Sequence, residues 1–186
     1  MISRYREPAL FLESGQVLRD VKLPEYRRGP DGQVVHSPTA FDWLVVLSQD
    51  CDLERDREDR ARREQDSTFE KETNLLRIAL VCPAFPATSV SSGTYLLGAK
   101  QWGSNERQLL DRDGEDRYHG LHSCEGKFDR LLIDFKLLTG AHPTYLESWI
   151  STHSDSAVAT LEAPFRDRLI QRFVGYLGRI PEPADS

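Results

Sequence analysis

The sequence lacks several features that mark common classes of protein. Its three cysteines have no paired spacing, which excludes a disulfide framework and favours a reducing compartment. Its longest apolar runs are far too short to cross a bilayer, and its N-terminus has no apolar stretch like that of a signal peptide. The formal net charge of -6 differs from the strongly basic balance of a general nucleic-acid binder. We therefore expect a cytoplasmic protein without a membrane segment.

Sequence motifs of the common enzyme classes are missing as well. No phosphate-binding glycine loop, Gly-x-Ser-x-Gly elbow or His-Glu-x-x-His pattern occurs. No Cys-x-x-Cys pair offers the tight ligand spacing of a structural zinc site. We therefore predict neither a resident metal nor a cofactor.

Apolar residues are plentiful enough for a core, since 39% of the chain is hydrophobic. The length of 186 residues predicts one domain over residues 1–186, with a frayed tail at 181–186. We predict a mainly β fold with C-terminal helices (α+β), built on an SH3-like small barrel or a strongly bent antiparallel sheet. Covered strands are expected at 16–23, 41–48, 75–82 and 131–138, and weaker strands at 92–97, 107–110 and 117–122.

Two helices are predicted near the C-terminus, a short one at 143–150 and a longer one at 164–178. In the longer helix, Phe165, Leu169 and Phe173 recur every four residues, which is typical of an apolar face packed on a core. We expect these three side chains to pack against the sheet.

Two segments are expected at the surface. Residues 26–38 contain the turn signals Gly29-Pro30 and Asp31-Gly32, which predict a long exposed connection or irregular hairpin. Residues 54–72 form a charged insertion with almost no apolar side chain to bury. A solvated helix and a flexible insertion both fit that composition, and neither requires a chemical role.

A short reactive string follows the most apolar predicted strand. Asp50, Cys51 and Asp52 come directly after it, where a strand end could hold side chains rigidly and expose them. Cys51 could be a nucleophile or a metal ligand, with either aspartate as a base or orienting group. However, two flanking carboxylates oppose thiolate formation. The alternative is a buried structural cysteine between aspartates that accept hydrogen bonds from turn amides.

A second reactive string contains His119 and His122. Either histidine could meet Cys51 in space and form a Cys-His pair. A surface strand that carries polar histidines explains the same residues without chemistry. We expect Asp50, Cys51 and Asp52 to border the most polar concavity, with one of these histidines beside them.

The order of the apolar strings resembles that of the MazF/PemK toxins. The matching strings are Gly15-Gln16-Val17, WLVVLS at 43–48, IALVCP at 78–83 and LLIDF at 131–135, followed by the C-terminal helix. The resemblance implies a small barrel of SH3-like topology. Several members of that family are endoribonucleases paired with antitoxins, so it also implies RNA and an antitoxin-like protein as partner classes.

One departure from the family pattern affects the predicted activity. Family members enter the strand that corresponds to 43–48 through an Arg-Pro pair whose arginine serves the active site, whereas Asp42-Trp43 stands there in this chain. The nearest arginines are Arg27 and Arg28. The resemblance implies that Thr88 or Ser89 takes the place of a family Ser or Thr. The candidate RNA-binding residues are therefore Arg27, Arg28, His36 and Thr88.

Three functions therefore remain. We favour a non-enzymatic protein-interaction component of a bacterial stress, toxin-antitoxin or defence system. An endoribonuclease toxin that cleaves single-stranded RNA is the first alternative, and a thiol enzyme that uses Cys51 with His119 or His122 is the second. A protein partner is expected, while RNA binding and a homodimer stay open.

Overall fold

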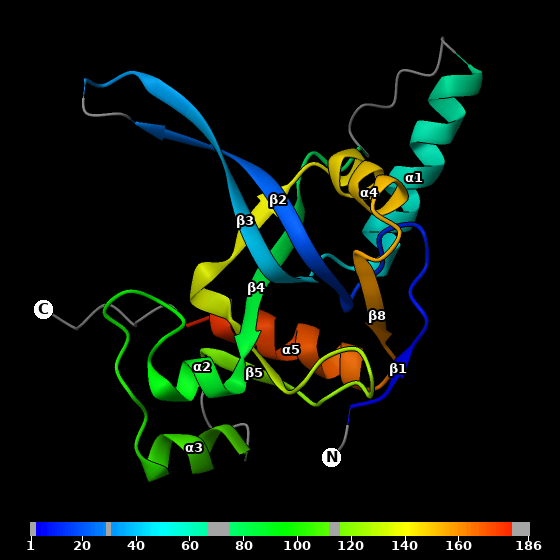
Figure 1. The fold of residues 1–186 in the computed structure, drawn as a ribbon. Coiled ribbons are helices and arrows are strands. Elements are labelled where there is room, and N and C mark those ends of the chain that lie inside the picture. Colours follow the sequence, from blue (N-terminus) through cyan, green and yellow to red (C-terminus); the bar gives the residue numbers. More distant parts are fainter. Residues whose placement is uncertain (1–2, 29–30, 67–74, 112–115, 180–186) are drawn as a thin grey trace, which may run out of the picture.

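An antiparallel sheet of eight strands forms the centre of the molecule (Figure 1). The structure is a computed structural model and describes residues 3–28, 31–66, 75–111 and 116–179. The strand order is β1-β8-β2-β3-β4-β6-β5, with β7 beside β4. This α+β architecture agrees with the predicted fold class, and the described strands form an open path. The strands are β1 (Tyr5–Arg6), β2 (Gln16–Arg28), β3 (Val34–Val46), β4 (Ala79–Pro86), β5 (Tyr118–Leu121), β6 (Leu131–Asp134), β7 (Thr139–Ala141) and β8 (Ala157–Leu161).

Strand β4 belongs to both halves of the sheet. It pairs with β3 along one edge, and along the other edge with β7 at its start and β6 at its end. A short 3-10 helix, η2 (Phe135–Leu137), separates β6 from β7, and the Asp134 carboxylate caps it by accepting a hydrogen bond from the Lys136 backbone N–H. The single strand predicted at 131–138 is therefore interrupted.

Strands β2 and β3 extend well beyond the rest of the sheet. Strand β2 pairs with β8 only at 16–18, and β3 pairs with β4 only at 44–46. Residues 22–28 and 34–40 therefore pair only with each other, and we call this two-stranded projection the ribbon (Figure 1). Of the two alternatives predicted for 26–38, the hairpin agrees with this antiparallel pairing, whereas a long unpaired connection is wrong because strand pairing continues through most of the segment. Residues 29–30 lie outside the described part.

The ribbon contains two prolines that face each other, Pro24 of β2 and Pro38 of β3. Proline has no backbone N–H, so this pair cannot be one of those that exchange two hydrogen bonds across an antiparallel ladder. The two proline nitrogens therefore point toward the open edges of the ribbon. Each edge lacks a hydrogen-bond donor at that position.

The base of the ribbon is a distorted part of β2. Asp20 has a φ of 54°, and no other non-glycine residue in the described ranges has a positive φ. The pairing of β2 with β8 also shifts register between Val17 and Leu18. These irregularities lie where β2 leaves β8, so they mark the bend at which the ribbon departs from the sheet.

Helices cover both faces of the sheet and form separate apolar clusters with it. Leu169 and Phe173 of α5 are buried and Phe165 packs against the same cluster, which confirms the predicted apolar face. Leu146 and Ile150 of α4 pack in a second cluster with the base of the ribbon. The helices are α1 (Asp50–Gln65), α2 (Ala87–Ser92), α3 (Ser104–Asp111), α4 (Pro143–Thr152) and α5 (Phe165–Leu177).

Several predicted elements have a different form in the structure. Helix α1 shows that the described part of the charged insertion is helical, while residues 67–74 lie outside the described ranges. The strands predicted at 92–97 and 107–110 are wrong, since α3 covers the second range and no described strand covers the first. Strand β8 was not predicted. Four of its five residues are apolar and its last four are buried, but so short an apolar run does not distinguish a strand from other buried segments.

None of the described helices is long and apolar enough to span a membrane.

Candidate functional site

Asp50 lies in the first turn of α1, not at the end of a strand as predicted. Strand β3 ends at Val46, and the carboxylates of Asp50 and Asp52 favour a helix start because they face the positive end of its dipole. Asp50 Oδ1 accepts a hydrogen bond from the Ser14 backbone N–H at 2.7 Å. Its Oδ2 lies 2.6 Å from Arg166 Nη1 on α5. Asp50 therefore joins the N-terminal segment, α1 and α5.

Cys51 and Asp52 are exposed on the same helical turn. The Cys51 Sγ lies 3.6 Å from Gln49 Oε1 and 3.9 Å from Asp52 Oδ1. Both neighbouring atoms are oxygens, and neither supplies the positive charge that would stabilise a thiolate. Cys51 is not the buried structural cysteine that the alternative proposed.

The two histidines of the second string lie in different environments. His119 is only 6% exposed in β5, and its ring stacks on Phe135 with 6.4 Å between ring centroids. His122 is half-buried, and its Nδ1 lies 3.1 Å from the Ser3 hydroxyl. The contact shown for His119 is with Phe135, and the one shown for His122 is with Ser3. Those shown for Cys51 are with Gln49 and Asp52, so the structure shows no Cys-His pair among these contacts.

Asp50 does border a polar concavity, with a volume of about 250 Å³. Neither Cys51 nor Asp52 lines it, and neither histidine does. Of the predicted set, Asp50 alone lines this concavity, so the structure does not bring Asp50, Cys51, Asp52 and one of the histidines together there. The lining residues are Phe11, Leu12, Glu13, Asp50, Glu54 and Arg57.

Two of the candidate RNA-binding residues share one face of the ribbon. Side chains alternate along a strand, so the even-numbered positions of 22–28 and 34–40 lie on one side, which we call the ribbon face. The described side chains there are all exposed, and none is a carboxylate. The next even-numbered residue of β3 is Asp42, and it lies outside the ribbon, where the ribbon joins the sheet. The described residues of the ribbon face are Lys22, Pro24, Arg28, Val34, His36, Pro38 and Ala40.

The other two candidates do not join them in the described structure. Arg27 pairs with Val35 in the ladder, but its side chain lies outside the described part. Thr88 is exposed on α2, which lies at the bottom of Figure 1, whereas the ribbon projects to the upper left. Lys22 also lies on the ribbon face, and its place there depends on strand pairing that the sequence of one strand does not reveal.

A buried ion pair elsewhere was missed entirely. Asp134 is fully buried, and its two oxygens accept hydrogen bonds from Arg117 Nε at 2.7 Å and NH2 at 2.6 Å. The hydroxyls of Tyr95 and Tyr118 lie 2.9 Å apart beside this pair. Burial raises the pKa of Tyr118, so its hydroxyl stays protonated. The only sequence signal for this network was a charged residue within each of two predicted strands, Arg117 in 117–122 and Asp134 in 131–138.

Among the described residues, no group of three or more His, Cys, Asp or Glu side chains is placed to hold a metal ion. Comparison of the chain with protein-family models, with curated proteins and with solved structures finds no match. The case for function therefore depends on the ribbon face and on the pockets of this chain.

Proposed function

We propose that this protein is a non-enzymatic interaction component whose ribbon face binds an acidic segment of a partner protein. The resemblance of the strand order to MazF/PemK supports placing it in a bacterial stress, toxin-antitoxin or defence system. The same resemblance supports an SH3-like relationship for the bent sheet.

One observation carries the proposed binding mode. The ribbon face presents Lys22, Arg28 and His36 without a carboxylate among its described residues, although the chain as a whole has a net charge of -6. The opposite face differs, because Glu25 there accepts a hydrogen bond from the Thr39 hydroxyl at 2.6 Å. Charge complementarity therefore favours an acidic partner on the ribbon face.

The apolar side chains of the ribbon face favour a protein over a nucleic acid. Val34 is 71% exposed, and Pro24, Pro38 and Ala40 are exposed beside it. Protein interfaces combine apolar contacts with a charged rim, whereas nucleic-acid surfaces depend mainly on many cations that contact phosphates. The described ribbon face offers two permanent cations, which is a weak phosphate footprint.

The alternatives of RNA cleavage and thiol chemistry have less support. General acid-base catalysis needs its groups within hydrogen-bond reach, but Asp50 and Thr88 lie on elements remote from the ribbon tip (Figure 1). The contacts of Cys51 with oxygen atoms do not activate a thiol.

The proposal is tested by fluorescence anisotropy with two labelled probes. The first is a short peptide that alternates glutamate with leucine, and the second is a short single-stranded RNA of mixed sequence. We expect the peptide to bind, and a peptide with glutamine in place of glutamate to bind far more weakly.

A double charge reversal then locates the contact. Lys22→Glu with Arg28→Glu should weaken peptide binding by about tenfold or more. Arg55→Glu with Lys100→Glu changes the net charge equally at exposed positions away from the ribbon and should leave binding unchanged. Equal losses in both double variants, or RNA binding that exceeds peptide binding, would overturn the proposal.

A further inference from the structure

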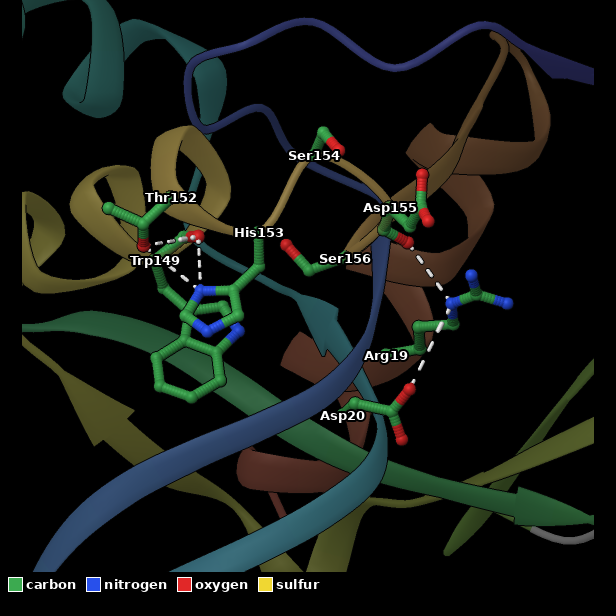
Figure 2. Close-up of a pocket in the computed structure, with 8 residues that line it drawn as sticks. All are labelled: Arg19, Asp20, Trp149, Thr152, His153, Ser154, Asp155 and Ser156. Carbon is green, nitrogen blue, oxygen red and sulfur yellow. Dashed lines mark hydrogen bonds and ion pairs between the residues drawn. The ribbon is translucent and has the colours of Figure 1, made fainter.

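A pocket at the end of α4 is built around two buried polar atoms that have no partner. Trp149 Nε1 and Ser156 Oγ are both buried, and neither makes a hydrogen bond in the structure. Ser156 is only 4% exposed. Both residues line a pocket of about 350 Å³ between α4, the start of β8 and the base of the ribbon (Figure 2). Buried polar groups are almost always paired, so two unpartnered polar atoms on residues that line one pocket make it a candidate site for a polar ligand.

The aromatic wall of this pocket is held in place by local contacts. The rings of Trp149 and His153 stack with 4.0 Å between centroids and an interplanar angle of 12°. His153 Nδ1 lies 3.1 Å from the Trp149 carbonyl oxygen and 2.9 Å from the Thr152 hydroxyl (Figure 2). That hydroxyl donates to the Ser148 carbonyl, so Nδ1 carries a proton toward two acceptors. The indole N–H is therefore presented by a fixed ring.

The exposed rim of the pocket carries charges of both signs. Arg19 donates from Nε to the Asp155 carbonyl oxygen at 3.1 Å, and the same nitrogen lies 3.9 Å from Asp20 Oδ2 (Figure 2). The Asp20 side chain is 81% exposed, and Asp155 is exposed as well. Hydrogen-bond donors thus lie at the buried floor, and two carboxylates beside one guanidinium lie at the mouth.

This distribution of charge and burial selects the class of ligand. The indole N–H can only donate, so its partner must be an acceptor such as a carboxylate oxygen. A simple anion would meet the repulsion of Asp20 and Asp155, and a simple cation would leave the floor donors unmatched. We propose that the pocket binds a small aminocarboxylate, with its carboxylate toward Trp149 and Ser156 and its protonated amine toward the two aspartates.

The volume of the pocket agrees with such a ligand. Small-molecule sites begin at about 300 Å³, which suits a molecule the size of a free amino acid. This inference does not depend on the ribbon face, which lies on another part of β2, and the two proposals can fail separately.

Isothermal titration calorimetry on the full chain tests the ligand class. The probes are glycine, β-alanine and 4-aminobutyrate, with butyrate and butylamine as matched molecules that carry one charge each. We expect at least one aminocarboxylate to bind at least tenfold more tightly than both butyrate and butylamine. Binding of none of them, or equal binding of a singly charged molecule, would overturn the proposal.

Three variants test the assigned contacts. Trp149→Phe keeps an aromatic ring but removes the N–H, and it should weaken binding about tenfold, whereas Trp102→Phe should not. Ser156→Ala should also weaken binding. Asp20→Asn should weaken the aminocarboxylate and strengthen butyrate, because it removes a charge that repels an anion.

Thermal unfolding of each variant separates loss of contact from loss of fold. The proposal requires weaker binding with an unfolding midpoint close to that of the unaltered protein. Unchanged affinity in both Trp149→Phe and Ser156→Ala would overturn the assignment of the pocket floor.

Discussion

The carboxylate of Asp50 connects the start of α1 to α5, because its Oδ2 lies 2.6 Å from Arg166 Nη1. Its other oxygen accepts the Ser14 backbone N–H. Asp50→Ala should destabilise the protein by roughly 1–3 kcal/mol, since it leaves a backbone donor without its acceptor. Asp50→Asn keeps an acceptor and loses only a partly exposed ion pair, which contributes under about 1 kcal/mol. Urea unfolding measures both values.

Asp52 is the control for this prediction, because it lies on the same turn but is exposed. Asp52→Ala should change the free energy of unfolding by less than about 0.5 kcal/mol. A loss as large as that of Asp50→Ala would mean that helix-dipole effects, not the Ser14 contact, explain the role of Asp50.

Sequence patterns predicted the core of this fold better than its periphery. The C-terminal helix was predicted because Phe165, Leu169 and Phe173 have a clear helical period. An irregular hairpin was one alternative for 26–38, but the length of the two strands was missed because turn signals at 29–32 and a proline in each strand interrupt the pattern. Pairing with the opposite strand keeps these residues extended, and pairing is not visible in one strand alone.

The site residues were predicted least well because their contacts join remote parts of the chain. Asp50 was identified, but nothing near it in sequence indicates Arg166 as its partner. Trp149 and Ser156 were not singled out, since an unpaired buried atom is defined only by the packing around it.

The buried pair of Arg117 and Asp134 predicts an asymmetry between two substitutions. Arg117→Ala leaves a fully buried carboxylate without its cation and should cost roughly 3–5 kcal/mol. Asp134→Ala should cost less, because the Arg117 side chain is 33% exposed and can turn toward water. Chemical denaturation of both variants measures the difference, and an equal or reversed order would contradict it.

The strained residue at the base of the ribbon predicts a stabilising substitution. Asp20 has a φ of 54°, a region that glycine occupies without the steric cost of a Cβ. Asp20→Gly should therefore stabilise the protein by roughly 0.5–1 kcal/mol, while Asp20→Ala should destabilise it. The unfolding midpoint in differential scanning calorimetry tests this, with Asp20→Asn expected to stay close to the unaltered protein. A lower unfolding midpoint for Asp20→Gly than for Asp20→Ala would contradict backbone strain at Asp20.

The three cysteines should react with iodoacetamide in a fixed order. Cys51 is exposed and should be modified first. Burial raises the pKa of Cys124, which lowers its thiolate fraction and should slow its reaction. Burial also raises the pKa of Cys82, whose thiol lies 3.0 Å from the Asp134 carbonyl oxygen, so it should react only on unfolding. Mass spectrometry of a time course gives the order, and early modification of Cys82 would be inconsistent with this core.

The facing prolines of the ribbon have a consequence for how the molecule behaves in a crowded cell. A bare two-stranded projection invites other extended chains to add to its edges and build aggregates. Pro24 and Pro38 remove a donor from each edge at the same level, so an incoming strand finds the row of backbone hydrogen bonds broken on either side. Strand addition along the ribbon edges is therefore disfavoured, so the contacts of the ribbon depend more on its side chains than on its backbone.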